Sequence, residues 1–380
     1  MQELISPAGD WISLRAAIEA GADAIYFGIK EFSMRSKNFK LSELKEITKE
    51  CHKNKVKAYL TLNTIVYEEE LKQINQILKQ VKAAKIDAIH AWDMAIIKEA
   101  IKLKIPVHLS TQASVSNSEA AKFYKKLGVQ RIILARECNL KQIKEISKII
   151  DTEVFIHGAM CVSVSGRCFL SQFEFNKSAN RGECLQPCRR EYIIEDEEGK
   201  KLKVGENYVL SPKDLCTLPF IDKLKKSGVK GFKIEGRNRS PEYVKTVTEV
   251  YRDALDGKKV DVKKLKTVYN RGFSSGFYLG KPMPKDFTDK YGSKATKKKV
   301  YIGKIVKVYK KINVAEVKVE AHGLEIGDDL MIQGEKTGVK SQELKSMEIN
   351  HKKVRNVKKG LAGVKFEFEV RKNDMVYVIK

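Results

Sequence analysis

A regular alternation of short apolar segments with amphipathic ones over residues 1–256 is the feature that most constrains the fold. The apolar segments are often β-branched, as strands covered on both faces are. The predicted strands are Glu3–Ser6, Ala24–Gly28, Lys57–Leu62, Ala88–Ala91, Val107–Ser110, Arg131–Ala135, Val154–Ile156 and Gly231–Ile234. The predicted helices include Leu41–Lys53, Glu68–Ala84, Asp93–Lys102, Ser118–Leu127 and Leu140–Ile149.

Eight strands that alternate with helices favour a closed (β/α)8 barrel over an open doubly wound sheet. No Gly-x-Gly-x-x-Gly follows the first strand, where a dinucleotide-binding sheet carries it. We therefore predict an α/β fold with a TIM-like barrel domain over residues 1–285. Ser42 and Asn139 are expected helix N-caps, and Gly21 and Gly128 are expected to end helices.

Two segments depart from the alternation. Residues 158–208 are too many for an ordinary loop between strands seven and eight, so we predict an insertion there. After the polar segment Lys294–Lys299 no helical periodicity remains, which predicts a small antiparallel β-barrel over residues 294–380. Its expected strands are Val300–Val308, Val314–Ala321, Asp329–Gln333, Met347–Ile349, Val364–Val370 and Met375–Ile379.

Charge and hydropathy narrow the class of protein. The chain carries 73 Lys and Arg against 48 Asp and Glu, a net charge of +25. Such a surface usually associates with nucleic acid or anionic ligands, although a lysine-rich organism would give the same excess. No apolar stretch is long enough to span a membrane, and the N-terminus lacks the pattern of a secretory signal. We expect a cytoplasmic protein without membrane contact.

Four of the seven cysteines gather in the predicted insertion, at Cys161, Cys168, Cys184 and Cys188. Loops that follow barrel strands form the active face of such a fold, so the cysteines lie where chemistry is expected. Their irregular spacing suits an iron–sulfur cluster. Structural zinc usually has paired knuckles, a spacing that only Cys184 and Cys188 provide. Ordinary buried thiols are the third alternative.

The remaining cysteines and the charges near the cluster complete this picture. Cys51 and Cys138 are predicted core or surface thiols, and Cys216 a core thiol or an alternative fourth ligand. Arginine binds phosphate and carboxylate groups well, so cations near the cluster favour an anionic ligand over a merely solvated loop. These cations are Arg167, Lys177, Arg181, Arg189 and Arg190.

The motifs around the cysteines resemble a known family. They are Val154–Cys161, Ser165–Ser171, Asn180–Cys184 and Pro187–Arg189, with further matches at Pro7–Gly9, Gly21–Gly28, Ser110–Ser114, Lys233–Arg237, Asn270–Phe273 and Gly276–Tyr278. Over about residues 1–285 this set resembles peptidase family U32, the collagenase-like peptidases. Val164 and Arg190 depart from the signature, where aromatic residues are common. The C-terminal residues resemble a small barrel of translation factors.

The resemblance implies more than the family name. Members of the family include oxygen-independent hydroxylation factors with a 4Fe-4S cluster. Some form 5-hydroxyuridine at the wobble position of tRNA, with prephenate implicated as hydroxyl donor. Others act on a ribosomal RNA cytidine or in ubiquinone biosynthesis. Carried over residue by residue, the family's cluster ligands fall on Cys161, Cys168, Cys184 and Cys188.

The residues themselves give proteolysis no mechanism. No His-Glu-x-x-His occurs in the chain. Gly272–Gly276 matches Gly-x-Ser-x-Gly, but no buried strand is predicted before it, so we interpret it as a structural turn. A cysteine peptidase would pair a thiolate with His157, yet the same thiolates suit a cluster better.

Polar residues at strand ends are the remaining candidate site residues. His157 is expected to bond a cluster sulfur, donate a proton or serve structurally. Arg237 is expected to clamp a donor carboxylate that Glu235 orients, unless the two form a mutual salt bridge. Asn63 and Gln112 are expected to read a base edge. Substrate-binding cations are predicted at Arg167, Arg181 and Arg189.

Together these features predict an iron–sulfur enzyme that hydroxylates a nucleobase in RNA, with a tRNA wobble uridine as the expected target. RNA sites combine basic surface with aromatic side chains that stack on bases, although core packing is the better interpretation of each single aromatic. The candidate stackers are Tyr26, Phe32, Trp92, Phe273, Phe277 and Tyr278. The alternatives are a collagenase-like peptidase, a hydroxylation factor for ribosomal RNA or a quinone precursor, and a zinc-stabilised RNA-binding module.

Overall fold

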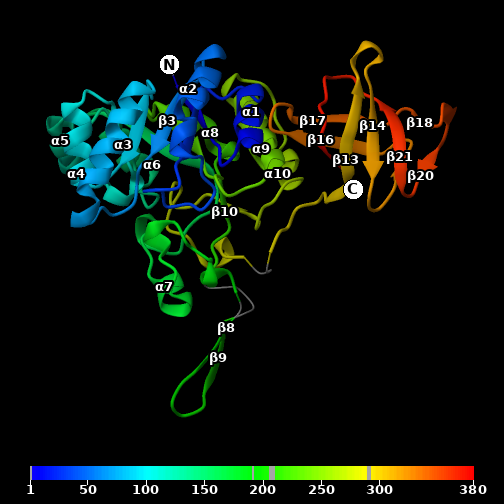
Figure 1. Cartoon of the computed structure of the whole chain (residues 1–380). Helices are drawn as coiled ribbons and strands as arrows, with labels where there is room; N and C mark the ends of the chain where they lie inside the picture. Colours follow the sequence, from blue (N-terminus) through cyan, green and yellow to red (C-terminus); the bar gives the residue numbers. More distant parts are fainter. Residues whose placement is uncertain (1, 191, 205–209, 289–291) are drawn as a thin grey trace.

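The computed structural model describes residues 2–190, 192–204, 210–288 and 292–380, and its main body is a closed parallel barrel (Figure 1). Strands β1 to β7 pair in chain order, and β11 closes the ring by pairing with both β7 and β1. The barrel strands are β1 (Glu3–Pro7), β2 (Ala24–Gly28), β3 (Lys57–Thr61), β4 (Ala88–Ala91), β5 (Val107–Leu109), β6 (Arg131–Ile133), β7 (Asp151–Gly158) and β11 (Gly231–Ile234). The predicted TIM-like barrel is confirmed.

Helices surround the barrel and cover its apolar outer face. They are α1 (Trp11–Glu19), α2 (Leu44–Lys53), α3 (Leu71–Ala83), α4 (Met94–Lys102), α5 (Ser118–Leu127), α6 (Leu140–Ser147), α8 (Ile221–Lys225), α9 (Pro241–Leu255) and α10 (Val262–Lys266). The Asn139 side chain caps α6 as predicted, and Gly128 ends α5 at a φ of +104°. Ser42 is not an N-cap: it lies inside a 3₁₀ turn that Lys40 begins and that leads into α2.

The cysteine-rich insertion leaves the barrel at the end of β7. Gly158 turns the chain there with a φ of +107°, and a Cβ at this position would lie 2.6 Å from the Glu235 carbonyl oxygen. The insertion contains α7 (Leu170–Phe175) and a hairpin of β8 (Tyr192–Glu195) and β9 (Lys201–Val204) that projects from the barrel (Figure 1). The end of the predicted insertion, residues 205–208, lies outside the described residues.

After the insertion the chain returns to the barrel through β10 (Asp214–Cys216), which pairs antiparallel with β7. The short strand β12 (Phe273–Ser274) pairs with β10 and so holds residues 270–280 beside the end of β7. A turn follows β12, with Gly276 at a φ of +56°, and within the described residues 275–288 there is no α-helix, only a 3₁₀ turn at Pro284–Asp286. The Gly272–Gly276 string is therefore a turn, as predicted, since a nucleophile elbow joins a strand to a helix.

The C-terminal domain is an antiparallel sheet curved around its own hydrophobic core. The sheet order is β17-β16-β22-β13-β14-β21-β18-β19, and β15 pairs separately with β20. These strands are β13 (Lys299–Tyr309), β14 (Val314–Val319), β15 (Leu324–Glu325), β16 (Asp329–Gly334), β17 (Gly338–Glu343), β18 (Met347–Ile349), β19 (Lys352–Lys353), β20 (Asn356–Val357), β21 (Gly360–Lys365) and β22 (Met375–Ile379).

The strands of this domain differ from the prediction at several places, and the two-residue strands β15, β19 and β20 were not expected. β17 was not expected, because it forms one end of the sheet and several of its side chains face solvent, which removes the alternating pattern. The strand expected at Val364–Val370 lies at Gly360–Lys365 instead. Phe366 is buried and Phe368 packs on the same core beyond the end of β21, so the apolar alternation continues past the strand.

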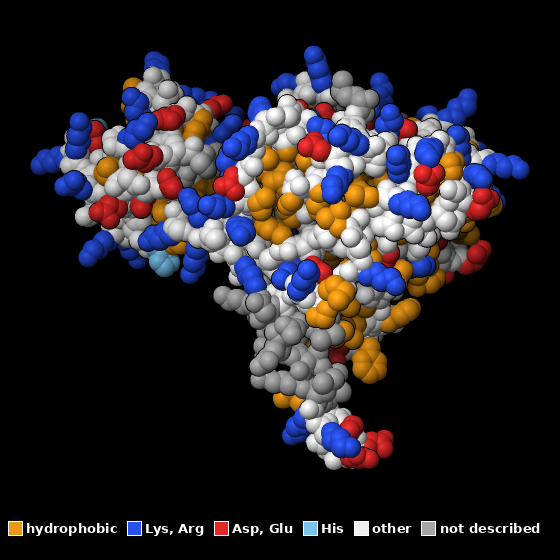
Figure 2. All heavy atoms as spheres, turned by 180° about the vertical axis from the view of Figure 1, so that it is seen from behind, with side chains coloured by type: hydrophobic (Ala, Val, Ile, Leu, Met, Phe, Trp, Pro, Cys, Tyr) orange, Lys and Arg blue, Asp and Glu red, His pale blue; other side chains and the backbone are white. Residues whose placement is uncertain are grey.

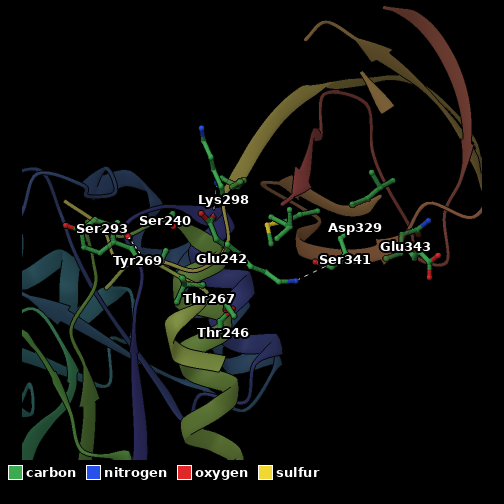
Figure 3. Close-up of a pocket in the computed structure, with 18 residues that line it drawn as sticks. Ser240, Glu242, Thr246, Thr267, Tyr269, Ser293, Lys298, Asp329, Ser341 and Glu343 are labelled. Atoms are coloured by element: carbon green, nitrogen blue, oxygen red, sulfur yellow. Dashed lines mark hydrogen bonds and ion pairs between the residues drawn. The ribbon is translucent and has the colours of Figure 1, made fainter. Parts of the chain in front are cut away.

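The two domains pack through α1, α9 and β17. Arg15 on α1 donates to the Glu335 carbonyl at 2.6 Å, and Glu242 on α9 bonds both Lys299 at 2.9 Å and Gln333 at 2.8 Å. A cavity of about 770 Å³ lies between the domains (Figure 3). Acids lie among its lysines, as in the 3.5 Å pair of Lys297 with Asp329, so its charges largely cancel. No helix among the described residues has the length and apolarity needed to cross a membrane.

Candidate functional site

The structure brings the four clustered cysteines around one cavity of about 130 Å³ at the carboxyl end of the barrel strands. Cys161 follows β7, Cys168 precedes α7, and Cys184 and Cys188 follow in the same insertion. Each of the four is a free thiol, and none is fully buried. The thiols therefore face a common space that solvent can reach.

Local hydrogen bonds fix the cysteine backbone. The Cys168 amide donates to Asn180 Oδ1 at 3.2 Å, and Leu170 donates its amide to Cys168 Sγ at 3.3 Å. Burial raises the pKa of Cys188 to about 11 against the lowering effect of Arg189, and the other three cysteines raise it further. That mutual effect is the electrostatic sign of four sulfurs in one place.

The spacing of the sulfurs bears on the choice between zinc and an iron–sulfur cluster. Four thiolates around zinc lie about 3.8 Å apart, which follows from tetrahedral bonds of about 2.3 Å. Among the described residues, no three cysteine sulfurs lie within 4.8 Å of one another. A donor set made of sulfur alone is the set that holds an iron–sulfur cluster, and this cofactor stays a prediction. Cys51, Cys138 and Cys216 are buried and do not line the cysteine cavity.

A second, smaller cavity of about 50 Å³ opens at the barrel mouth and shares Arg35, Arg136 and Glu235 with the cysteine cavity. Lys233 and Arg237 add two more cations to its lining. Arg136 is only 9% exposed, its guanidinium lies 4.1 Å from the centre of the Phe155 ring, and its Nε has no hydrogen-bond partner. Within the described residues no carboxylate pairs with Arg136, so the mouth holds uncompensated positive charge.

Glu235 and Arg237 both line this mouth, but they do not form the mutual salt bridge. Glu235 lies 3.7 Å from Arg35 and accepts the Ala159 amide at 3.3 Å. Burial alone would raise the pKa of Glu235, yet Arg35, Arg239 and Arg136 hold it below its ordinary value. Arg237 donates to Ser33 at 2.5 Å, and burial lowers its pKa to about 10. Both groups are therefore charged at neutral pH.

His157 lies behind the mouth and lines neither cavity. Its ring packs against Tyr243, Tyr251 and Phe273, with the Tyr251 hydroxyl 3.4 Å from Nδ1. Burial, with a contribution from Arg239, lowers the pKa of His157 to about 3. A neutral, enclosed imidazole favours the structural alternative, and its proposed contact with a sulfur stays a prediction.

Some of the predicted substrate-binding residues are already bound to other groups of the protein, and others are free to contact a ligand. Arg181 pairs with Glu70 and donates to the Ile65 carbonyl, and Arg189 donates to the Met160 carbonyl at 2.6 Å. Arg167 is exposed and bonds only the Ser114 hydroxyl, at 3.1 Å, among the described residues. Asn63 and Gln112 line the mouth, where Asn63 Oδ1 accepts the Met34 amide and Gln112 accepts from Ser110.

The predicted aromatic stackers also divide by exposure. Tyr26, Phe32 and Tyr278 are 5% exposed each, so core packing describes them. Trp92, Phe273 and Phe277 keep part of their surface open.

Three cations of the mouth cavity were missed at the sequence level: Arg35, Arg136 and Lys233. Arg136 directly follows the predicted sixth strand, so the rule that strand ends carry function would have found it. Lys233 interrupts an otherwise apolar strand, which marks an inward-facing charge. Arg35 lies in an irregular segment after β2, where no local pattern indicates that it reaches Glu235.

One further group of candidate ligands lies inside the barrel. The ligand atoms of His90, His108 and Glu153 all lie within 4.8 Å of one another. Lys233 Nζ lies 2.8 Å from Glu153 and 3.0 Å from His90 Nδ1, and Arg131 lies 3.7 Å from Glu153. Two cations of the protein therefore lie against the carboxylate of this group, which forms a charged layer of the barrel interior.

The family model of peptidase family U32 matches residues 9–288, which include the barrel, the cysteine insertion and the cation-lined mouth. The chain belongs to peptidase family U32.

Three relatives show the range of proteins that this chain is similar to. An uncharacterized protease of Methanocaldococcus jannaschii is 44% identical over 100% of this chain and 98% of its own. A collagenase of Porphyromonas gingivalis is 39% identical over 99% of this chain and 97% of its own. A tRNA hydroxylation protein of Bacillus subtilis is 36% identical over 74% of this chain and 71% of its own. The names of these relatives are those of enzymes or modification proteins of two kinds, proteases and RNA hydroxylation proteins.

Proposed function

We propose that this protein is an iron–sulfur-dependent enzyme that hydroxylates a nucleobase in RNA, with the wobble uridine of tRNA as the expected target. The observation that carries the proposal is the pair of adjoining cavities, one lined by four cysteines and one by cations. Relatives named for tRNA hydroxylation support the RNA substrate. Lys and Arg side chains spread over both domains, as Figure 2 shows from one side, and support binding to a polyanion.

The cofactor expected at Cys161, Cys168, Cys184 and Cys188 is a 4Fe-4S cluster. When bound, it would supply electron transfer or an iron that polarises an oxygenated donor. The protein's part is to hold four thiolates at the edge of the mouth. Arg35 and Arg189 lie beside them and would offset the negative charge that the thiolates bring.

The barrel mouth is the expected site of a small carboxylate donor, for which the resemblance to the family implies prephenate. Arg136 and Arg237 would bind the carboxylate because both guanidinium groups line the cavity and neither pairs with an acid among the described residues. Glu235 is held by Arg35 and by the Ala159 amide, so it would orient the donor from the cysteine side. Because the two cavities share part of their lining, a donor in the mouth would lie next to a cluster held by the cysteines.

The test is mass spectrometry of nucleosides from total tRNA and ribosomal RNA of cells with and without the gene. The proposal expects loss of one species heavier by one oxygen, with recovery by the wild-type gene but not by Cys184→Ala. The identity of that nucleoside separates a wobble uridine from a ribosomal cytidine. An unchanged profile contradicts the proposal, and a quinone-precursor assay then follows.

A peptidase is the second candidate, and the specific observation in its favour is the protease and collagenase names of relatives that cover nearly the whole chain. Among the described residues that line the two cavities, the one histidine is His90, which lies in the barrel interior. The cysteine cavity therefore has no histidine in its lining that could act as a base for a thiol nucleophile. Digestion of casein and collagen by apo and cluster-loaded protein tests this alternative. Cleavage by the wild-type apo protein that Cys184→Ala abolishes would favour it.

A further inference from the structure

A further cavity, of about 320 Å³, lies beside the cysteine insertion. Trp92, which follows β4, forms one wall, and Arg167 and Phe169, which flank Cys168, form another. Met34, Ile65 and Asn180 complete the lining. The cavity is therefore built from aromatic, apolar and cationic side chains, with no carboxylate in its lining.

The aromatic side chains of this cavity are placed to receive a flat ligand. Trp92 donates its indole N–H to the Asn63 carbonyl at 3.0 Å, which fixes the orientation of the ring. Phe169 is 72% exposed, so its ring offers an open aromatic face at the cavity. Exposed aromatic faces beside a polyanion-binding surface are the usual platforms for unpaired bases.

Positive charge at the rim selects the class of ligand. The Arg167 guanidinium lies 5.8 Å from the centre of the Trp92 ring and is exposed. Its one hydrogen bond among the described residues goes to the Ser114 hydroxyl, so its charge is uncompensated. Arg181, by contrast, is paired with Glu70. A planar base stacks on the aromatic rings while its phosphate meets Arg167, whereas an apolar peptide would gain nothing from this cation.

The cavity is also joined to the cysteine site. Asn180, in its wall, accepts the Cys168 amide at 3.2 Å and donates its own amide to the Cys168 carbonyl at 3.3 Å. Met34 lines both this cavity and the cysteine cavity. A ligand bound against Phe169 therefore lies next to the residues that position Cys168.

From this geometry we infer that the cavity between Trp92 and Phe169 is a stacking site for one unpaired nucleobase of a single-stranded RNA segment, with Arg167 on its phosphate. The inference rests on the proposed RNA substrate and adds the place where the strand is held. Phe169 is the exposed platform and Trp92 the fixed one.

The test uses fluorescence, because the chain contains two tryptophans, Trp11 and Trp92. In Trp11→Phe protein, emission comes from Trp92 alone, and a stacked base quenches it. The probes are a uridine decamer and a decamer of the same charge with abasic positions. We expect saturable quenching by the first and none by the second. Quenching by neither, or equally by both, overturns the inference.

Matched variants locate the platform. Phe169→Ala removes one wall, and we expect the uridine decamer to bind about 5- to 100-fold more weakly, since one stacked base contributes about that factor. Phe169→Tyr should restore binding. The control is Phe173→Ala, since Phe173 is 88% exposed on the neighbouring α7 but does not line the cavity. Equal losses in Phe169→Ala and Phe173→Ala would contradict a defined stacking site.

The outcome is independent of the proposed reaction. If the nucleoside profile depends on Cys184 but Phe169→Ala leaves quenching and the Michaelis constant for RNA unchanged, RNA hydroxylation stands and the stacking site is wrong. If Phe169→Ala abolishes quenching while no nucleoside changes in cells without the gene, the stacking site stands and the hydroxylation is wrong. Quenching by a collagen-like peptide in place of RNA overturns the inference.

Discussion

Two clusters of metal-ligating residue types occur in this molecule, and they differ in almost every physical respect. His90, His108 and Glu153 lie inside the barrel, with their ligand atoms close together and almost fully buried. The four cysteines lie at its mouth, wider apart and partly exposed. The interior cluster has the more compact geometry, yet the cysteine cluster is the candidate cofactor site.

Charge explains the difference. Inside the barrel, Glu153 is bonded to Lys233 and Glu3 to Arg131, so each acid has a cation of the protein itself. At the mouth, Arg136 and Arg237 have no acidic partner among the described residues. Charges that are paired within the protein contribute to the fold, whereas unpaired cations at a cavity are available to bind an anionic ligand. Proximity of ligand atoms is therefore a weaker indicator of a site than uncompensated charge.

The largest expected effect is a loss of iron and sulfide when a cysteine of the mouth is replaced, with no such loss when a residue of the interior cluster is replaced. Cys184→Ala removes a thiolate that no neighbouring group can replace, so we expect anaerobically prepared protein to lose most of its iron, its sulfide and its visible absorption. His108→Ala and Cys216→Ala alter residues outside the cysteine cavity and should retain all three. The measurement is iron and sulfide analysis together with absorption spectra.

Two results would break this comparison. Retention of iron in Cys184→Ala protein would remove Cys184 from the ligand set. Loss of a metal in His108→Ala protein would show that the barrel interior, despite Lys233 and Arg131, holds an ion. Zinc without sulfide in the wild-type protein would favour the zinc-stabilised alternative.

The sequence predicts a region well where its interactions are local in the chain, and poorly where they join distant residues. The barrel strands follow from local hydrophobic patterns, and the predicted strand positions agree closely with β2, β4 and β11. The grouping of the four cysteines was visible as spacing, and the structure places them around one cavity. The contacts of Glu235 with Arg35 and of Arg181 with Glu70 join residues far apart in the chain, and no local pattern encodes them.

The second prediction compares the two regions by stability. Glu153→Gln leaves Lys233 and Arg131 without their shared acid in the barrel interior, and we expect the free energy of unfolding to fall by about 3–5 kcal/mol. The matched change in the cysteine insertion is Glu183→Gln, whose partner Lys177 lies 3.4 Å away at half-exposed positions. That variant should lose less than about 1 kcal/mol. Urea unfolding of the two apo proteins measures both, and equal losses would contradict a closed interior charge set.

The smallest expected effect is a difference in how the stability of the two regions depends on pH. The barrel contains buried histidines, whereas the cysteine insertion, residues 158–208, contains none. Burial lowers the pKa of His157 from 6.5 to about 3, and the groups packed against it are Tyr243, Tyr251, Phe273 and the nearby Arg239, none of them acidic. Since the folded pKa lies below the unfolded one, the unfolded chain takes up the proton first as pH falls. The stabilisation by neutral His157 is fully present above about pH 6.5 and decreases toward pH 3, with a loss of about 2 kcal/mol at pH 5.

The measurement is urea unfolding at pH 7 and pH 5. On acidification, the free energy of unfolding of His157→Gln should fall by about 2 kcal/mol less than that of wild type, and the exposed control His322→Asn should follow wild type. An equal loss in His157→Gln and wild-type protein would contradict a lowered pKa of His157, and the buried ring would then carry a proton at pH 5.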